Sequence, residues 1–124
     1  MIIIKKEDSP QYIRDNIRSF LLVSEYTTGA KHITTSLVEM APGGIQKPHH
    51  HKTEQCYMIL EGSGIMEING EKAPVVAGDT IFIPSNSMHS LKNEGQTTLK
   101  YISAGSPVFG KEKERHLWPL NLKN

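Results

Sequence analysis

Cysteine is nearly absent from the sequence, and neither sign of charge dominates it. The 124 residues include a single cysteine, Cys56, which excludes an intramolecular disulfide and a zinc finger or ribbon. Lys and Arg number 14 against 13 Asp and Glu, for a formal net charge of +1. This balance does not indicate a nucleic-acid groove or a polybasic membrane surface. We therefore expect neither nucleic acid nor a membrane among the partners.

Long apolar runs are absent as well. The N-terminal run is Ile2-Ile3-Ile4, whereas a secretory signal needs an apolar region of about 7 to 15 residues. No stretch approaches the roughly 18 apolar residues of a membrane-spanning helix. We expect a cytoplasmic protein that forms one domain over residues 1–124.

Turn-forming residues recur at short intervals, and the runs between them are rich in Ile, Val, Thr, Tyr and Phe. This pattern predicts an all-β sandwich or barrel. The clearest hairpin joins residues 65–68 to 71–76 through Asn69-Gly70, a pair typical of type I′ turns because both positions need a positive φ. The other expected strands are residues 2–5, 20–27, 32–40, 48–51, 55–60, 80–84, 88–93 and 99–104.

Signals for a helix are scarce. Ser9 as N-cap and Pro10 at the first position favour a short helix over residues 11–19, with Ile13 and Ile17 on its buried face. At the other end, residues 105–124 form a C-terminal tail that contains the only tryptophan, Trp118. We interpret this side chain as a docking anchor, either on its own barrel or on a second subunit.

Histidines gather between Pro48 and Gln55. On a strand, residues two apart share a face, so His49 and His51 point the same way and His50 points away. If the strand runs unbroken, Gln55 lies on the face of His49 and His51. His89 opens a later strand after a turn and is the candidate ligand from a distant element. The predicted metal ligands are His49, His51, Gln55 and His89.

This donor set limits the metal and the substrate. Imidazole suits the divalent transition metals, so we expect one ion of Mn, Fe, Ni, Zn or Cu. Three neutral imidazoles and one neutral amide leave the charge of the ion uncompensated, which favours an anionic substrate or a bound hydroxide. An octahedral ion with four protein ligands keeps two positions open.

The segment 43–93 resembles the two motifs of the cupin superfamily. The first motif, with its spaced glycines and His-x-His, is matched by Gly43, His49, His51, Gln55 and Gly62; the second, after 15 residues, is matched by Gly78, Pro84, Asn86, His89 and Asn93. Gln55 replaces the usual glutamate ligand, and some sugar-processing cupins that act on uronate-type sugars share this replacement. Asn86 replaces a glycine and tolerates the left-handed conformation.

The resemblance implies a fold and a range of functions. It implies a double-stranded β-helix, the jelly-roll barrel of the RmlC-like cupins, with a metal inside one end and with homodimers common. Within it, Tyr57 and Tyr101 are candidates for hydrogen bonding or proton transfer to a substrate.

Three functions remain open at this point. One is a metal-dependent enzyme acting on a small polar or anionic molecule, such as a carbohydrate or carboxylate derivative, with isomerase, lyase and dioxygenase chemistry not separated. The alternative is a non-catalytic module that binds a small molecule or a metal. A structural protein with a vestigial site is a third, weaker interpretation, because all four ligand positions are filled.

Overall fold

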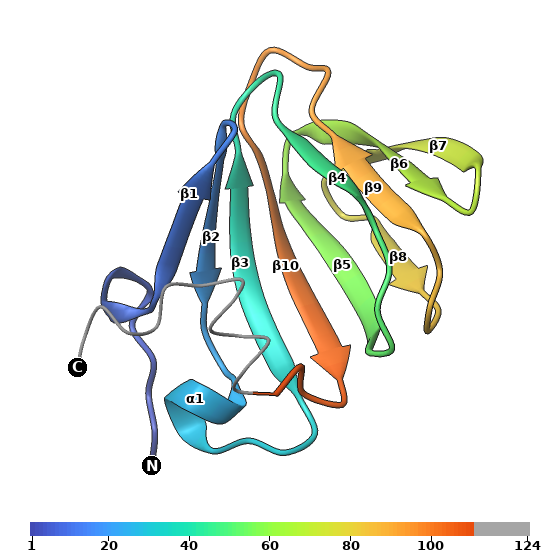
Figure 1. Cartoon of the computed structure of the whole chain (residues 1–124). Coiled ribbons are helices and arrows are strands. Elements are labelled where there is room, and N and C mark those ends of the chain that lie inside the picture. The colour runs from blue at the N-terminus through green and yellow to red at the C-terminus, as the bar shows by residue number, and fades with distance from the viewer. Residues whose placement is uncertain (111–124) are drawn as a thin grey trace.

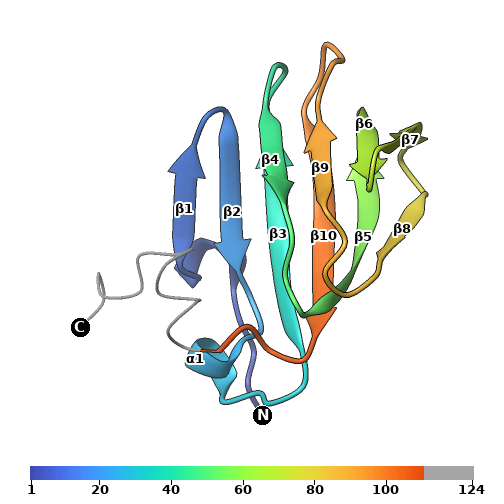
Figure 2. The same cartoon turned by 45° about the vertical axis from the view of Figure 1, so that its right-hand side comes forward.

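The computed structural model describes residues 1–110, and antiparallel strands in two sheets make up most of it (Figure 1). This confirms the all-β prediction. The smaller sheet lies across one face of the larger one, as Figure 2 shows. None of the helices in this range is long and apolar enough to cross a membrane. The tail beyond residue 110, with Trp118, lies outside the described residues.

Six strands form the larger sheet and four form the smaller one. In spatial order the larger sheet contains β1 (Gln11–Arg14), β2 (Ile17–Leu21), β3 (Thr34–Met40), β10 (Leu99–Ser106), β5 (Glu54–Glu61) and β8 (Thr80–Ile83). The smaller sheet contains β4 (Ile45–His49), β9 (His89–Lys92), β6 (Ser63–Ile68) and β7 (Glu71–Val76). Two short helices, η1 (Lys6–Asp8) and α1 (Glu25–Thr28), precede β1 and β3 respectively.

The inward faces of the central strands change from apolar to polar along their length. Leu99 of β10 pairs with Met40 of β3 at one end, and Ser103 pairs with Ser36 toward the other, with all four side chains buried. Apolar side chains from both sheets fill the first end. This core contains Ile17, Val38, Met40, Tyr57, Ile59, Met66, Val75, Ile83, Leu91, Leu99 and Tyr101. The second end is left for a polar cavity.

The predicted hairpin at Asn69-Gly70 is confirmed. Asn69 has φ 50° and Gly70 has φ 88°, the left-handed conformation that a type I′ turn requires. The turn joins β6 to β7, and Ile68 pairs with Glu71 beside it. The local signal was sufficient here because the turn type is set by two adjacent residues.

The helix predicted over residues 11–19 is wrong, because this segment forms the β1–β2 hairpin. Asp15 has φ 45° and Asn16 has φ 66°, and both residue types tolerate the left-handed region. The hairpin pairs with β3 through contacts such as Ile17 with Met40. Ile13 is 62% exposed and Ile17 is 2% exposed, so the two isoleucines do not share a buried face.

Two other predicted strands differ from the structure. Residues 2–5 form no strand, and Ile2 and Ile3 are 64% and 72% exposed. The strand predicted over residues 20–27 ends at Leu21. Ser24 interrupts it by accepting a hydrogen bond from the Thr27 backbone N–H at 3.0 Å, which caps α1. A side-chain cap therefore outcompetes the β propensity of this segment.

Replacing Gly62 with alanine should destabilise the fold by more than its backbone conformation alone explains. Gly62 has φ 80°, and an added Cβ would lie 2.4 Å from the Thr98 carbonyl oxygen. Gly78 has φ 98° with nothing within 4 Å of such a Cβ. We expect Gly78→Ala to cost about 1 to 2 kcal/mol and Gly62→Ala roughly 2 kcal/mol more, measured by urea denaturation. Equal losses would contradict a steric role for Gly62.

Candidate metal centre

Three histidines converge at the polar end of the sandwich. His49 is the last residue of β4 and His89 the first residue of β9, and the register of these paired strands places them opposite each other. His51 lies in the loop that follows β4. The ligand atoms of the three rings all lie within 4.8 Å of one another. A single metal ion could therefore bind all three.

Hydrogen bonds orient each imidazole ring. In every case the ring Nδ1 lies within 2.9 Å of a backbone carbonyl oxygen two residues away, and a carbonyl can only accept, so Nδ1 carries the proton. The pairs are His49 with Lys47, His51 with Thr53 and His89 with Ser87. This arrangement places the lone pair on Nε2, and such outer hydrogen bonds are usual for metal-binding histidines.

The loop that carries His51 is tied to the turn that precedes His89. The Asn86 backbone N–H donates to the His51 carbonyl oxygen at 2.7 Å. Asn86 has φ 62°, so it adopts the left-handed conformation predicted for this position. The two ligand-bearing segments therefore hold each other in place.

Gln55 brings an amide oxygen to the same region from β5. Its Nε2 donates to the Ser103 hydroxyl at 2.9 Å, which leaves Oε1 as the free end of the amide. Gln55 Oε1 and His89 Nε2 are buried and have no hydrogen-bond partner among residues 1–110. A buried polar atom left unpaired costs about 1 to 3 kcal/mol, and a bound cation would satisfy both atoms. The donor set therefore fits a divalent metal.

The strand does not run unbroken from the histidines to Gln55, so the condition attached to the parity argument is not met, and the strand expected over residues 48–51 lies instead at residues 45–49. β4 ends at His49 and β5 begins at Glu54, with His51 in the loop between them. Within β5 the expected alternation holds, since Gln55 and Tyr57 are buried and Glu54 is exposed. His51 and Gln55 thus reach the same cavity because the chain turns between them.

Burial controls the protonation of His89. Burial is the largest of the effects that together lower the pKa of His89 to about 4; the hydrogen bond to the Ser87 carbonyl opposes it, and the nearby imidazoles of His49, His51 and His50 add to it. His89 is therefore neutral at physiological pH. The neutral form is the one that binds a metal.

Tyr57 and Tyr101 lie side by side beneath the histidines. Their ring centroids are 4.6 Å apart, and the Tyr57 ring lies 6.2 Å from that of His89. Burial raises the pKa of both phenols well above the usual value, and their hydroxyls are hydrogen-bonded to each other. Both phenols therefore keep their protons, and since one hydroxyl donates to the other, the pair has one O–H left to donate to a ligand. They do not supply a base at neutral pH.

A cavity of about 360 Å³ opens beside the histidines and both tyrosines. This volume suits a small molecule. Sequence analysis missed three side chains in its wall, Arg14, Gln46 and Phe109. Arg14 was missed because its segment was assigned to a helix. Once the β1–β2 hairpin is recognised, alternation with exposed Ile13 places Arg14 on the inner face.

Arg14 is held at the cavity by neutral partners. Its guanidinium donates to Gln46 Oε1 at 2.9 Å and lies 4.6 Å from the centroid of the Tyr12 ring. None of the ion pairs found among the described residues involves Arg14. Its positive charge is therefore available to an anion in the cavity.

Comparison with known families identifies the sequence pattern. A family model described as "Cupin domain" matches residues 36–105, more than half of the chain. The match includes the three histidines and Gln55. Similar proteins include both binding proteins and enzymes.

Individual relatives cover different shares of the chain. An uncharacterized protein of Methanocaldococcus jannaschii is 40% identical over 63 residues, or 51% of this chain and 50% of the relative, so this match spans half of that protein. An oxalate-binding protein of Thermotoga maritima is 28% identical over 110 residues, or 83% of this chain and 91% of the relative.

Solved structures confirm the jelly-roll fold. A crystal structure from Thermotoga maritima, described as a predicted oxalate decarboxylase, superposes with a TM-score of 0.75 at 23% identity. The superposition covers 86% of this chain and 100% of the other. At this identity the likeness establishes the shared architecture.

Removing one histidine of the cluster should abolish tight metal binding. We expect the wild-type chain to bind one Ni²⁺ ion in isothermal titration calorimetry, with an affinity more than about 100-fold weaker for His89→Ala. His50→Ala is the matched control, because His50 is exposed beside the cluster and its loss should leave the affinity unchanged. Equal binding by both variants would contradict the site.

Proposed function

Because the chain belongs to the cupin domain family, we propose that it is a metal-dependent enzyme acting on a small anionic molecule in the cavity between its sheets. The ion, one of Mn, Fe, Ni, Zn or Cu, is bound by His49, His51, Gln55 and His89. When bound, it supplies Lewis-acid polarisation of a substrate oxygen or a site for O₂. The alternative is a non-catalytic module that binds the same ligand.

The observation that carries this proposal is the convergence of neutral donors at one point. The cluster of three rings and the free amide oxygen of Gln55 contain no carboxylate. A divalent ion in this site keeps its full charge, which attracts an anionic ligand to the open coordination positions. Glutamine in place of glutamate is therefore a feature that selects the substrate.

Arg14 supports the anionic substrate class independently of the ion. A guanidinium offers two parallel N–H donors that match the two oxygens of a carboxylate. Gln46 holds the group at the cavity wall. We infer that Arg14 binds and orients the carboxylate of the substrate. The name of the oxalate-binding relative from Thermotoga maritima agrees with this class.

The two tyrosines complete the polar surface of the cavity. Because burial keeps Tyr57 and Tyr101 protonated and one hydroxyl donates to the other, the pair offers its one remaining O–H to an oxygen of the substrate. Their mutual hydrogen bond helps to fix the direction of this donor. We infer that they orient the substrate and stabilise negative charge that develops on it.

Removal of the Arg14 charge should weaken carboxylate binding. With oxalate as the probe and the metal-loaded protein, we expect Arg14→Met to raise the dissociation constant about 10- to 100-fold, the effect of losing a charge-assisted hydrogen bond. Arg18→Met is the control, because Arg18 is exposed on the same hairpin and does not line the cavity. Elemental analysis after titration verifies that oxalate has not extracted the metal. Unchanged binding in Arg14→Met would contradict its role.

Introducing a carboxylate at position 55 should strengthen the binding of the metal and weaken the binding of an anionic ligand. In Gln55→Glu the added charge partly neutralises the ion, so we expect metal affinity to rise about tenfold or more and oxalate affinity to fall by a similar factor. Glu54→Gln changes an exposed neighbour and should alter neither. A fall in metal affinity in Gln55→Glu would show that residue 55 is not a ligand.

Turnover distinguishes the enzyme from the binding module. Metal-loaded protein is incubated with small carboxylic acids and sugar acids, and products are followed by NMR. Turnover that disappears in His89→Ala supports the enzyme. Binding without turnover across the panel supports the non-catalytic module.

A further inference from the structure

Hydroxyl groups line the inner face of the six-stranded sheet where this face forms the wall of the cavity. Ser19 of β2, Ser36 of β3 and Ser103 of β10 lie on three consecutive strands. All three residues are buried and line the cavity. Ser36 and Ser103 are paired directly with each other across β3 and β10. We call these three residues the hydroxyl row.

Each end of the hydroxyl row contacts a group of the candidate site. Arg14 Nη1 donates to the Ser19 Oγ at 3.4 Å, and Gln55 Nε2 donates to the Ser103 Oγ at 2.9 Å. In strand order the row therefore lies between the guanidinium on β1 and the candidate metal ligand on β5. A ligand that contacts both groups lies against the row.

The hydroxyl row has hydrogen-bonding capacity that the protein itself does not use. A hydroxyl group can donate one hydrogen bond and accept two. Ser19 and Ser103 act as acceptors in the two bonds just described. Among residues 1–110 we find no hydrogen bond in which a hydroxyl of the row is the donor. The hydrogens of the row are therefore available to a molecule in the cavity.

Thr34 shows unused capacity beside the row. It lies two residues before Ser36 on the same face of β3 and also lines the cavity. Thr34 is 3% exposed, and its Oγ1 has no hydrogen-bond partner among residues 1–110. An unpaired buried polar atom is costly and calls for an explanation. A hydroxyl group of a ligand beside Thr34 would supply one.

This inference rests on the proposed function, in which Arg14 binds a carboxylate beside a metal ion. We propose that the substrate is a polyhydroxylated carboxylic acid, of the sugar-acid class, and that Ser36, Ser103 and Thr34 recognise its hydroxyl groups. Hydroxyl groups of the protein and of such a ligand both donate and accept, so the two sets are complementary. A dicarboxylate without hydroxyl groups offers only acceptors and leaves the accepting capacity of this wall unused.

Two of these residues allow a clean test, because they do not support the metal and carboxylate contacts. Arg14 and Gln55 form their side-chain hydrogen bonds with Ser19, Gln46 and Ser103. Neither Ser36 nor Thr34 is a partner in these bonds. Removal of the hydroxyl group at position 36 or 34 therefore leaves the guanidinium and the amide in place.

Matched ligands test the recognition of hydroxyl groups. Gluconate and hexanoate are both six-carbon monocarboxylates, and only gluconate carries hydroxyl groups. We expect the metal-loaded wild-type protein to bind gluconate at least about tenfold more tightly in isothermal titration calorimetry, because a site with buried polar groups rejects a ligand that leaves them unpaired. Elemental analysis after titration verifies that gluconate has not extracted the metal.

Removal of single hydroxyl groups tests the residues. Ser36→Ala and Thr34→Val should each weaken gluconate binding about threefold to tenfold, the effect of one hydrogen bond. Ser63→Ala is the control, because Ser63 is exposed on β6 and does not line the cavity, and its gluconate affinity should equal that of the wild type. Unchanged gluconate binding in both Ser36→Ala and Thr34→Val would overturn the proposal.

Thr34→Val also distinguishes a ligand contact from a structural role. Valine has the shape of threonine without the hydroxyl group. Removing an unpaired buried oxygen should leave the unliganded protein as stable as the wild type, or more stable, in urea denaturation. A loss of stability in Thr34→Val would assign the hydroxyl group to the fold and contradict its role in recognition.

The inference and the proposed function fail in different ways. Oxalate carries no hydroxyl group, so its affinity should be the same in Ser36→Ala as in the wild type. Equal weakening of oxalate and gluconate would overturn the inference, because the variant then damages the whole cavity. Oxalate binding with no preference for gluconate over hexanoate would overturn the inference and leave the proposed function in place. Failure of the wild-type protein to bind any of these carboxylates would overturn both.

Discussion

The register between β4 and β9 is the constraint on which the candidate site depends. It places His49 opposite His89, while the bond between the Asn86 N–H and the His51 carbonyl brings the third histidine to the same point. The orientation of each imidazole ring is then fixed by a hydrogen bond from its Nδ1 to a backbone carbonyl oxygen. The backbone thus orients all three Nε2 atoms, and the site needs few side-chain partners to hold its shape.

A site of neutral donors is chemically distinct from one that includes a carboxylate. Gln55 and the imidazoles are neutral and, unlike a carboxylate, leave the charge of a bound ion uncompensated, so more of that charge is available to a ligand. Arg14 adds a second positive group at the cavity wall. Tyr57 and Tyr101 stay protonated because they are buried. The cavity therefore combines positive charge with hydrogen-bond donors, the environment that an anion requires.

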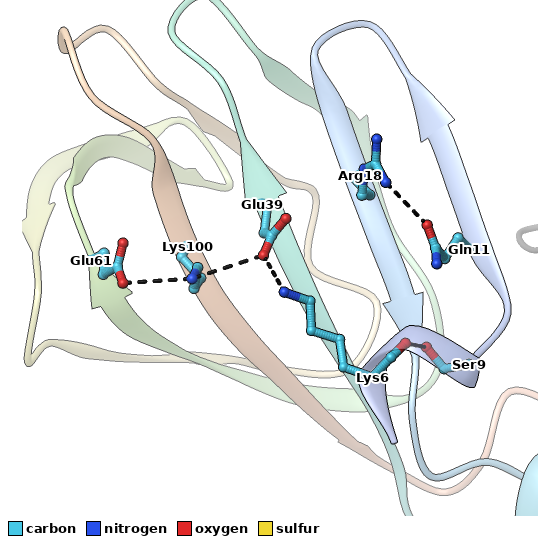
Figure 3. Close-up of polar contacts among 7 residues, drawn as sticks. All are labelled: Lys6, Ser9, Gln11, Arg18, Glu39, Glu61 and Lys100. Carbon is cyan, nitrogen blue, oxygen red and sulfur yellow. Dashed lines mark hydrogen bonds and ion pairs between the residues drawn. The ribbon is translucent and has the colours of Figure 1, made fainter. Parts of the chain in front are cut away.

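The two faces of the six-stranded sheet carry different kinds of side chain. Its inner face supplies the apolar core at one end and the polar cavity at the other, as the change from Leu99 to Ser103 along β10 illustrates. Its outer face carries apolar side chains such as Ile102 and charged ones such as Lys100, which lies near Glu39 and Glu61 (Figure 3). Because successive residues of a strand point to opposite faces, one strand supplies side chains to the cavity on its inner face and other side chains to the outer face.

The sequence by itself determined the all-β class, the Asn69-Gly70 hairpin and the inward face of β5, because alternation and turn types depend on adjacent residues. It also identified His49, His51 and His89, whose motif spacing is local. It did not predict the β1–β2 hairpin, since the Ser9-Pro10 start and the spacing of Ile13 and Ile17 also suit a helix. Only the tertiary structure shows that Arg14 lines the cavity and that His51 reaches it from a loop. These placements depend on pairing between distant strands, and long-range pairing leaves no signature in local periodicity.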